Sequence, residues 1–224
     1  MRPEIQRYQQ INQFSLSLMA NWENFRFVCI DSESTGLDPR KDRLVSIAGV
    51  GVCNGEICLW DQFSVILPVA YNTSSVTVHG ITREESTEGI EEPEALARFL
   101  DWLCDGIIVG HHIQHDLILL NNALQKHYSL KLKNVVIDTM VSFLTLKKTG
   151  GFKSLSEVKG HSLDALCDLF HLVPHDRHTA IGDAFLTSQI LLRILKEAGK
   201  LDQWNLRDLQ AWHADQPFPF DEGK

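Results

Sequence analysis

The stretch FVCIDSESTG, residues 27–36, decides the fold and raises the question of function. Its apolar start is typical of a buried strand, and this strand runs directly into two carboxylates, Asp31 and Glu33. Side chains two residues apart on a strand point to the same face, so the two negative groups lie side by side. Left alone they would repel each other, and a divalent cation such as Mg²⁺ or Mn²⁺ would remove that conflict. The alternative is that the strand has ended and both acids face water. For this pair taken alone the alternative is favoured, so further ligands are needed.

The rest of the chain predicts an α/β fold, with a mixed β-sheet flanked by α-helices. Residues 43–67 predict two strands joined at Asn54-Gly55, a dipeptide typical of hairpin turns with positive φ at both residues. Two further short strands are expected, at 106–112 and 135–139. Apolar spacing and capping signals predict helices at 91–104, 116–127, 140–148, 163–170 (capped by Ser162) and 179–200. The expected division is an N-terminal helix or tail over 1–24, one domain over 25–200 and a partly loose C-terminal extension over 201–224.

Composition and charge argue against several classes of protein. The 224 residues carry a formal net charge of −8, which does not suit a protein that coats long duplex DNA through a basic surface. It is compatible with an enzyme that grips only a strand end, where bound cations neutralise the local charge. No apolar run is long enough to span a membrane, and the N-terminus lacks an apolar signal-peptide region. The five cysteines are odd in number and lack paired CxxC spacing, which is typical of reduced thiols in a cytoplasmic protein.

Two more acids and one histidine are candidates for the site of Asp31 and Glu33. Asp116 follows a predicted strand at the start of a helix, where it could also be an acid stabilised by the helix dipole. Asp183 lies in the apolar stripe of the last long helix, where an unpaired buried charge is costly. His178 precedes Asp183 by five residues, about 500° of helix, so it reaches the site only from the loop before that helix. Its alternative is a surface histidine.

Four stretches occur in the order, and at about the spacing, that characterise one nuclease family: IDSESTGLDP, VHGIT, GHHIQHDLILL and HTAIGDAFLTSQILL. Over roughly residues 25–198 the chain thereby resembles the DEDDh 3′–5′ exonucleases, which include the epsilon proofreading subunit of bacterial DNA polymerase III and ribonuclease T. The resemblance implies an RNase H-like fold and a two-metal-ion phosphodiester hydrolase. The residues that it implies as holding two divalent cations, Mg²⁺ or Mn²⁺, are Asp31, Glu33, Asp116 and Asp183, and it implies His178 as the general base.

The resemblance also implies a substrate and a way of holding it. The expected reaction releases 5′-nucleoside monophosphates from the 3′ end of single-stranded or frayed DNA. The backbone of Ser34, Thr35 and Gly36 would pass close to the terminal nucleotide, and Leu37 would wedge against its base. His79 of VHGIT either contacts the same nucleotide or packs locally in a turn.

Two positions beside Asp116 depart from the family pattern. His112 stands where many relatives have Asn, and His115 stands where they have an aromatic residue such as Phe. We expect this altered pair to change substrate preference or the hold on the end nucleotide, which makes His112 a candidate substrate-binding residue. The five central positions are intact.

The leading expectation is an enzyme that proofreads for a polymerase or trims DNA ends. One alternative keeps the chemistry and changes the substrate to RNA, as in ribonuclease T. The other is a non-cleaving subunit that docks on a DNA polymerase or a sliding clamp. No membrane association is expected in any of these.

Overall fold

The first three strands form an antiparallel unit, and the hairpin signal at Asn54-Gly55 predicts the pairing of the second strand with the third. In the computed structural model, strand β1 (Phe27–Ser34) pairs with β2 (Leu44–Cys53), and β2 pairs with β3 (Glu56–Ile66). The turn between β2 and β3 has φ values of 52° at Asn54 and 77° at Gly55. Asparagine and glycine adopt this left-handed conformation more readily than other residues, so the local sequence sets the hairpin.

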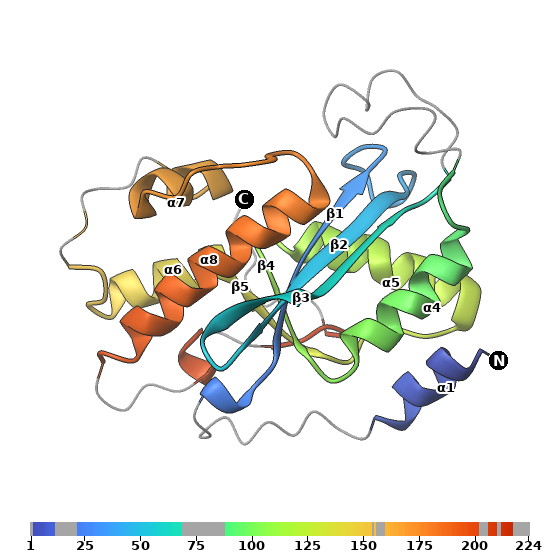
Figure 1. The fold of residues 1–224 in the computed structure, drawn as a ribbon, viewed down its shortest axis with the longest axis horizontal. Helices are drawn as coiled ribbons and strands as arrows, with labels where there is room; N and C mark the ends of the chain where they lie inside the picture. The colour runs from blue at the N-terminus through green and yellow to red at the C-terminus, as the bar shows by residue number, and fades with distance from the viewer. Residues whose placement is uncertain are drawn as a thin grey trace.

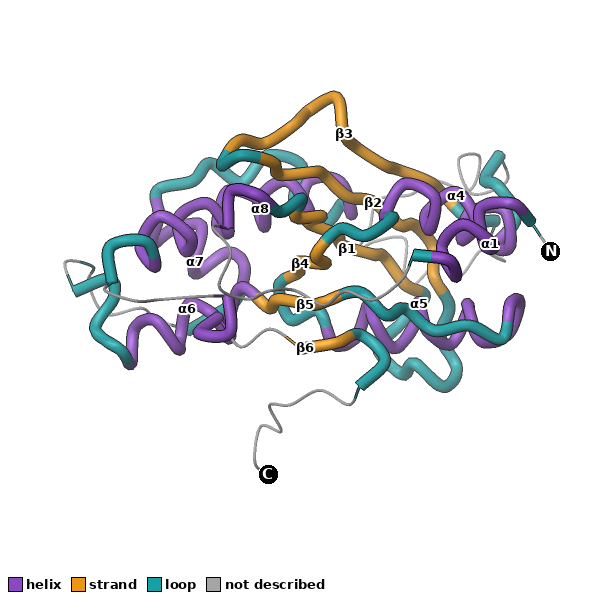
Figure 2. The backbone as a smooth tube through the Cα atoms, turned by 90° about the horizontal axis from the view of Figure 1, so that it is seen from below, coloured by secondary structure: helices purple, strands orange, loops and turns teal. Residues whose placement is uncertain are grey.

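The remaining strands extend the sheet on the other side of β1. Strand β4 (Ile107–Gly110) runs parallel to β1, and β5 (Val135–Asp138) runs parallel to β4. Strand β6 (Trp212–His213) pairs antiparallel with β5, which completes the order β3-β2-β1-β4-β5-β6 (Figure 2). The mixed sheet of an α/β fold is confirmed.

Helices cover both faces of this sheet, and each face buries its own apolar cluster (Figures 1 and 2). One face carries α1 (Pro3–Gln10), α4 (Glu92–Leu103) and α5 (Gln114–Tyr128). The other carries α6 (Thr139–Lys148), α7 (Leu163–Phe170) and α8 (Ala180–Ala198). The part of the chain that the structure describes also contains two short 3₁₀ segments, η1 (Trp22–Asn24) and η2 (Leu206–Leu209). Removal of these apolar side chains from water is the main force that holds the layers together.

The structure describes residues 2–11, 22–68, 88–153, 155, 160–201, 206–209 and 212–216. His79 and the rest of the VHGIT motif lie outside these residues. Among the helices in the described ranges, none combines the length and apolar character needed to cross a bilayer.

Alternation along β1 decides where its polar end points. Ile30 belongs to the apolar cluster beneath α1, α4 and α5, whereas Cys29 belongs to the cluster beneath α6, α7 and α8. Because successive side chains on a strand point to opposite faces, Asp31 and Glu33 continue the α8 face and Ser32 continues the α5 face.

Segments near both chain ends take part in the packed structure. Ile5 and Tyr8 of α1 are buried, and the Tyr8 hydroxyl donates to the side chain of Asn134 and accepts from the backbone N–H of Lys133. Strand β6 falls in the region that the sequence predicts to be partly loose, and its Trp212 is buried. A two-residue strand is too short for alternation of apolar and polar residues to mark it.

Candidate active site

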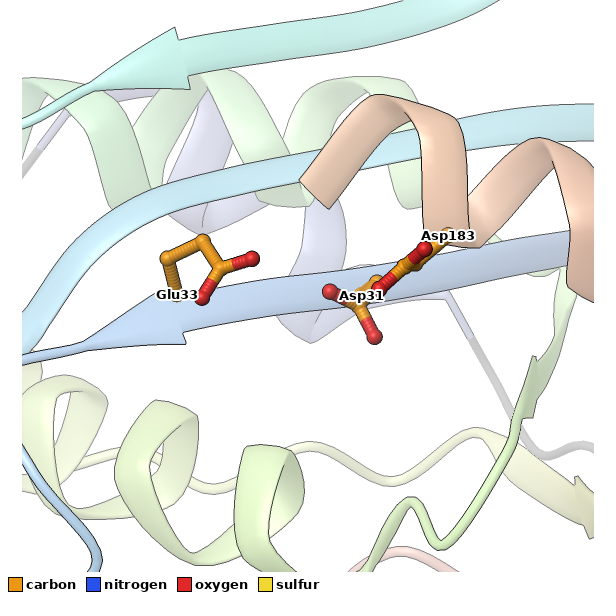
Figure 3. Close-up of side chains that lie close together, drawn as sticks. All are labelled: Asp31, Glu33 and Asp183. Carbon is orange, nitrogen blue, oxygen red and sulfur yellow. The ribbon is translucent and has the colours of Figure 1, made fainter. Parts of the chain in front are cut away.

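Three carboxylates from two distant segments meet beside the end of β1 (Figure 3). Asp31, Glu33 and Asp183 each offer one oxygen atom, and these atoms lie within 4.8 Å of one another. Asp31 and Glu33 face α8 because of their parity on β1, and Asp183 stands in the first turn of α8. The structure therefore brings together residues that are about 150 positions apart in the chain.

Local structure at the start of α8 holds Asp183 in place. The Thr179 side chain caps the helix by accepting from the backbone N–H of Gly182, at 3.2 Å. A Cβ atom at Gly182 would lie only 2.1 Å from the backbone oxygen of Asp176. Glycine at this position thus lets the preceding loop pack directly against the first turn, next to Asp183.

Asp116 joins the group from the other face of the sheet, through Ser32. The parallel ladder between β1 and β4 ends at Cys29, so the Ser32 N–H lies beyond it. That N–H and the Ser32 hydroxyl both donate to Oδ1 of Asp116, at 2.9 and 2.6 Å. Asp116 is buried in the first turn of α5, and its charge acts on Asp31. All four predicted acids are therefore in electrostatic contact around one strand end.

Burial and mutual repulsion make this group hard to ionise completely. Burial raises the pKa of Asp31 well above its ordinary value, and the charges of Asp116, Asp183 and Glu33 raise it further. Burial, followed by the charges of Asp183 and Asp116, raises the pKa of Glu33 to about 7. Burial also raises the pKa of Asp116 to about 6, although the hydrogen bonds from Ser32 oppose that rise. Such a concentration of partly desolvated carboxylates favours a bound positive charge.

The oxygen atoms of Asp183 show that a cation fits this site. Oδ2 accepts a hydrogen bond from Arg177, whereas Oδ1 is buried and has no hydrogen-bond partner among the residues that the structure describes. A buried charged oxygen without a partner is costly, and a divalent cation would satisfy it. A donor set of carboxylate oxygens suits Mg²⁺ or Mn²⁺. The acidic cluster is thus a candidate cation site.

Arg177 and Ser32 are site residues that no pattern in the sequence predicts. The Arg177 guanidinium donates from Nη1 to Asp183, and from Nε and Nη2 to the two carboxylate oxygens of Asp164, at 2.6 and 3.0 Å. The available signals were weak. Arg177 is a basic residue next to a candidate histidine, and Ser32 is a small residue between two candidate acids.

His178 lies on the loop that precedes α8, the only place from which it could reach the acids. It has a left-handed backbone with φ of 63°, and its side chain is exposed. Its charge acts on Asp164 of α7. The structure brings Arg177, rather than His178, into contact with Asp183, so the role of His178 stays a prediction.

The loop after β1 is held by Asp42 and presents Leu37. Asp42 accepts from the Thr35 hydroxyl and from the backbone N–H of Asp38, both at 2.8 Å. A Cβ atom at Gly36 would lie 2.7 Å from the Asp42 carboxylate, so glycine permits this close packing. Ser34 donates to the backbone oxygen of Gly36 at 2.7 Å. The Leu37 side chain, on the loop that follows the acids of β1, is 88% exposed.

The two histidines that depart from the family pattern lie in different surroundings. His115 on α5 is close to Asp116, where its charge opposes the rise in that pKa, and its Nε2 lies 3.4 Å from the Ser34 hydroxyl. His112 has a left-handed backbone with φ of 54°, and its ring packs edge-on against His111 with ring centres 4.9 Å apart. His115 therefore lies beside the strand end that carries the acids.

Comparison of sequences finds similarity to an exonuclease family and to PolC-type DNA polymerases. The RNase T family model, described as an exonuclease, matches residues 28–191. A PolC-type DNA polymerase III from Thermotoga petrophila is 33% identical over 214 residues, covering 91% of this chain and 15% of the polymerase. The PolC-type polymerase of Bacillus subtilis is 32% identical over 181 residues, covering 80% of this chain and 12% of the polymerase. The chain thus spans only a small part of the length of these relatives.

Comparison of structures finds the same fold in solved nucleases. E. coli exonuclease I in complex with a dA16 oligonucleotide matches with a TM-score of 0.66 at 17% identity, covering 79% of this chain and 42% of that chain. Cell-death related nuclease 4 matches with a TM-score of 0.65 at 15% identity, covering 77% of this chain and 64% of that chain. At such identities the likeness concerns the fold, and it confirms the expected RNase H-like architecture.

Proposed function

Because this chain belongs to the RNase T family of exonucleases, we propose that it hydrolyses phosphodiester bonds from the 3′ end of single-stranded or frayed DNA. The products would be 5′-nucleoside monophosphates, released one at a time. The observation that carries this proposal is the meeting of Asp31, Glu33 and Asp183 within 4.8 Å, with Asp116 tied to the same strand by Ser32.

The four acids would hold two divalent cations, Mg²⁺ or Mn²⁺. Bound there, the cations would neutralise the scissile phosphate, activate a water molecule and stabilise the leaving 3′ oxygen. The protein supplies the geometry for this. The fixed face of β1 presents Asp31 and Glu33, the first turn of α8 presents Asp183, and the paired hydrogen bonds from Ser32 hold Asp116.

We assign the proton transfer to His178, which would act as the general base toward the attacking water. Histidine is the side chain whose ordinary pKa suits proton transfer near neutral pH. An exposed position on the loop before α8 leaves the ring room to turn toward the acids when substrate is present. His178 directly follows Arg177, which contacts Asp183.

The terminal nucleotide would lie along the loop after β1. Ser34, Thr35 and Gly36 would run beside its sugar and phosphate, and the exposed Leu37 side chain would pack against its base. Asp42, which fixes the shape of this loop, would keep Leu37 in place. His79 and His112 complete the proposed contacts to the strand end.

The names of the relatives favour DNA as substrate and a replication enzyme as partner. The relatives quoted above are PolC-type DNA polymerases, and the matched exonuclease I structure holds a deoxyadenosine oligonucleotide. We propose that the chain proofreads or trims DNA 3′ ends and that it associates with a DNA polymerase or a sliding clamp.

The test is digestion of matched DNA and RNA oligomers, labelled at the 5′ end, by the full chain with Mn²⁺. We expect a ladder shortened from the 3′ end of DNA, and Asp31→Asn or Asp183→Asn should lower the rate by at least about 100-fold, since even residues that only support a metal ligand cost about 10- to 100-fold. Asp168→Asn, an exposed acid of α7 outside the cluster, is the matched control and should be fully active.

Three results would contradict the proposal. Unchanged activity in the Asp183→Asn preparation would mean that another protein is the source of the nuclease. RNA turnover equal to or faster than DNA turnover would assign the chain to RNA 3′-end trimming instead. A chain that binds DNA ends without digesting them would be a docking subunit.

A further inference from the structure

We propose that Arg177 is the built-in counter-ion of the cation site, and that binding of a divalent cation displaces it from Asp183. This inference rests on the proposed function, because it assumes that Asp183 is a cation ligand. It concerns what the site does before the cation arrives.

The contacts of Arg177 place a positive charge directly on a candidate ligand. Its Nη1 donates to Oδ2 of Asp183, while its Nε and Nη2 form a two-point pair with Asp164, at 2.6 and 3.0 Å. The side chain of Arg177 is 18% exposed and that of Asp183 is 11% exposed, so water screens this contact only in part. The contact is thus one that a cation at Asp183 would have to compete with.

Arg177 brings a positive charge into contact with this group of acids. Burial and the neighbouring acids raise the pKa of Asp31 and of Glu33, and for both of these acids Arg177 is the group that lowers it. His115 acts on the fourth acid, Asp116. Without a cation, Arg177 therefore supplies the positive charge that makes the crowding of acids on the α8 face tolerable.

Asp164 would keep its hydrogen bonds to Arg177 after Arg177 has released Asp183. Asp164 is the second residue of α7 and its side chain is 58% exposed, outside the acidic cluster. A planar guanidinium that forms two parallel hydrogen bonds to one carboxylate stays oriented even when a third bond breaks. Arg177 can therefore release Asp183 without losing its anchor, and the loop that carries His178 stays attached to α7.

A different role for Arg177 predicts the opposite effect on cation binding. If Arg177 only oriented Asp183 by holding Oδ2, so that the unpaired Oδ1 faced the cation, then its removal would weaken binding. If Arg177 competes with the cation for negative charge, its removal strengthens binding, because a nearby like charge and a competing contact both disappear. The sign of the change distinguishes the two roles.

The experiment is a calorimetric titration of the full chain with Mn²⁺ alone, comparing the natural protein with Arg177→Gln. We expect Arg177→Gln to bind Mn²⁺ about tenfold more tightly, the factor that loss of one partly screened like charge supplies. The metal-free variant should also melt at a lower temperature than the natural protein, because its acids have lost their counter-ion.

Two further variants control for charge and for folding. Arg193→Gln removes one positive charge from an exposed position on α8, about 15 Å along this helix from Asp183, and its Mn²⁺ affinity should match that of the natural protein. Arg177→Lys keeps the charge but lacks the fork that reaches both carboxylates, so its affinity should lie between those of the natural protein and Arg177→Gln.

Equal or weaker Mn²⁺ binding by Arg177→Gln would overturn the inference. If that variant fails to fold, Arg177→Lys decides in the same way, since equal or weaker binding again overturns it. Failure of the proposed function gives a different result. In that case the natural protein would bind no Mn²⁺, or Asp183→Asn would bind it as well as the natural protein does.

Discussion

At the scale of single residues, Asp31 and Ser32 are neighbours on β1 that contact acids on opposite faces of the sheet. Asp31 points toward α8 and meets Asp183, while its neighbour Ser32 points toward α5 and holds Asp116 by two hydrogen bonds. One strand thereby collects acids from helices on both faces of the sheet. The result is a small volume with several negative charges, and its ionisation should be visible in the stability of the metal-free protein.

The ordinary pKa of Glu33 is 4.5, and its pKa in the folded protein is about 7. The metal-free protein should therefore lose stability as the pH rises through this range. A carboxyl whose pKa is raised in the folded state binds its proton more tightly there than in the unfolded chain, so its stabilising effect is present at low pH and is lost as the pH rises through the folded value. Thermal melts in a chelating buffer measure this.

The control for this pH effect is Glu33→Gln, which removes the titrating group. The melting temperature of this variant should fall less than that of the natural protein over the same pH range. A natural protein whose melting temperature rises with pH, relative to Glu33→Gln, would show that Glu33 does not have a raised pKa.

At the scale of elements, Asp138 links the end of one strand to the starts of two helices. Its Oδ1 caps α6 by accepting from the backbone N–H groups of Met140 and Val141, at 2.9 and 3.3 Å. Its Oδ2 accepts from the backbone N–H of Ile113, at 3.0 Å, directly before α5. Because α5 carries Asp116, Asp138 fixes the place from which this acid reaches the site.

Asp138→Asn should therefore lower both stability and cation binding. The amide keeps one accepting oxygen and turns an N–H₂ group toward a backbone donor, which leaves a buried bond unmade at a cost of about 1–3 kcal/mol. Ser162→Ala, which removes the cap of α7, should cost about 1 kcal/mol and leave Mn²⁺ affinity unchanged. Urea unfolding and Mn²⁺ titration measure the two effects, and equal affinity in both variants would count against a positioning role for Asp138.

At the scale of the whole molecule, the candidate site joins segments from opposite faces of the sheet, each packed on its own apolar cluster. Helix α5 packs on one face of the sheet and α8 on the other, so the acids meet only where β1 extends beyond the end of its ladder with β4 (Figures 1 and 3). A cation bound there would tie both layers to the central strand.

Mn²⁺ should consequently raise the melting temperature of the protein. A ligand that binds only the folded state stabilises it by about 2.7 kcal/mol when its free concentration is 100 times the dissociation constant. Asp183→Asn should lose most of this shift, and Asp168→Asn should retain it. An identical Mn²⁺ shift in all three proteins would place the bound ion elsewhere.

Much of the architecture is determined by the sequence alone, because its signals depend on near neighbours. Asn54-Gly55 predicts the first hairpin, Ser162 predicts the start of α7, and strand parity places Asp31 and Glu33 on one face; the structure confirms each of these. Tertiary structure alone decided the rest. Arg177, rather than His178, contacts Asp183, because the turn before α8 directs the guanidinium inward and leaves the imidazole exposed. Ser32 can hold Asp116 only because the β1–β4 ladder ends at Cys29. Such meetings depend on how long elements pack against each other, and no local pattern of residues specifies that.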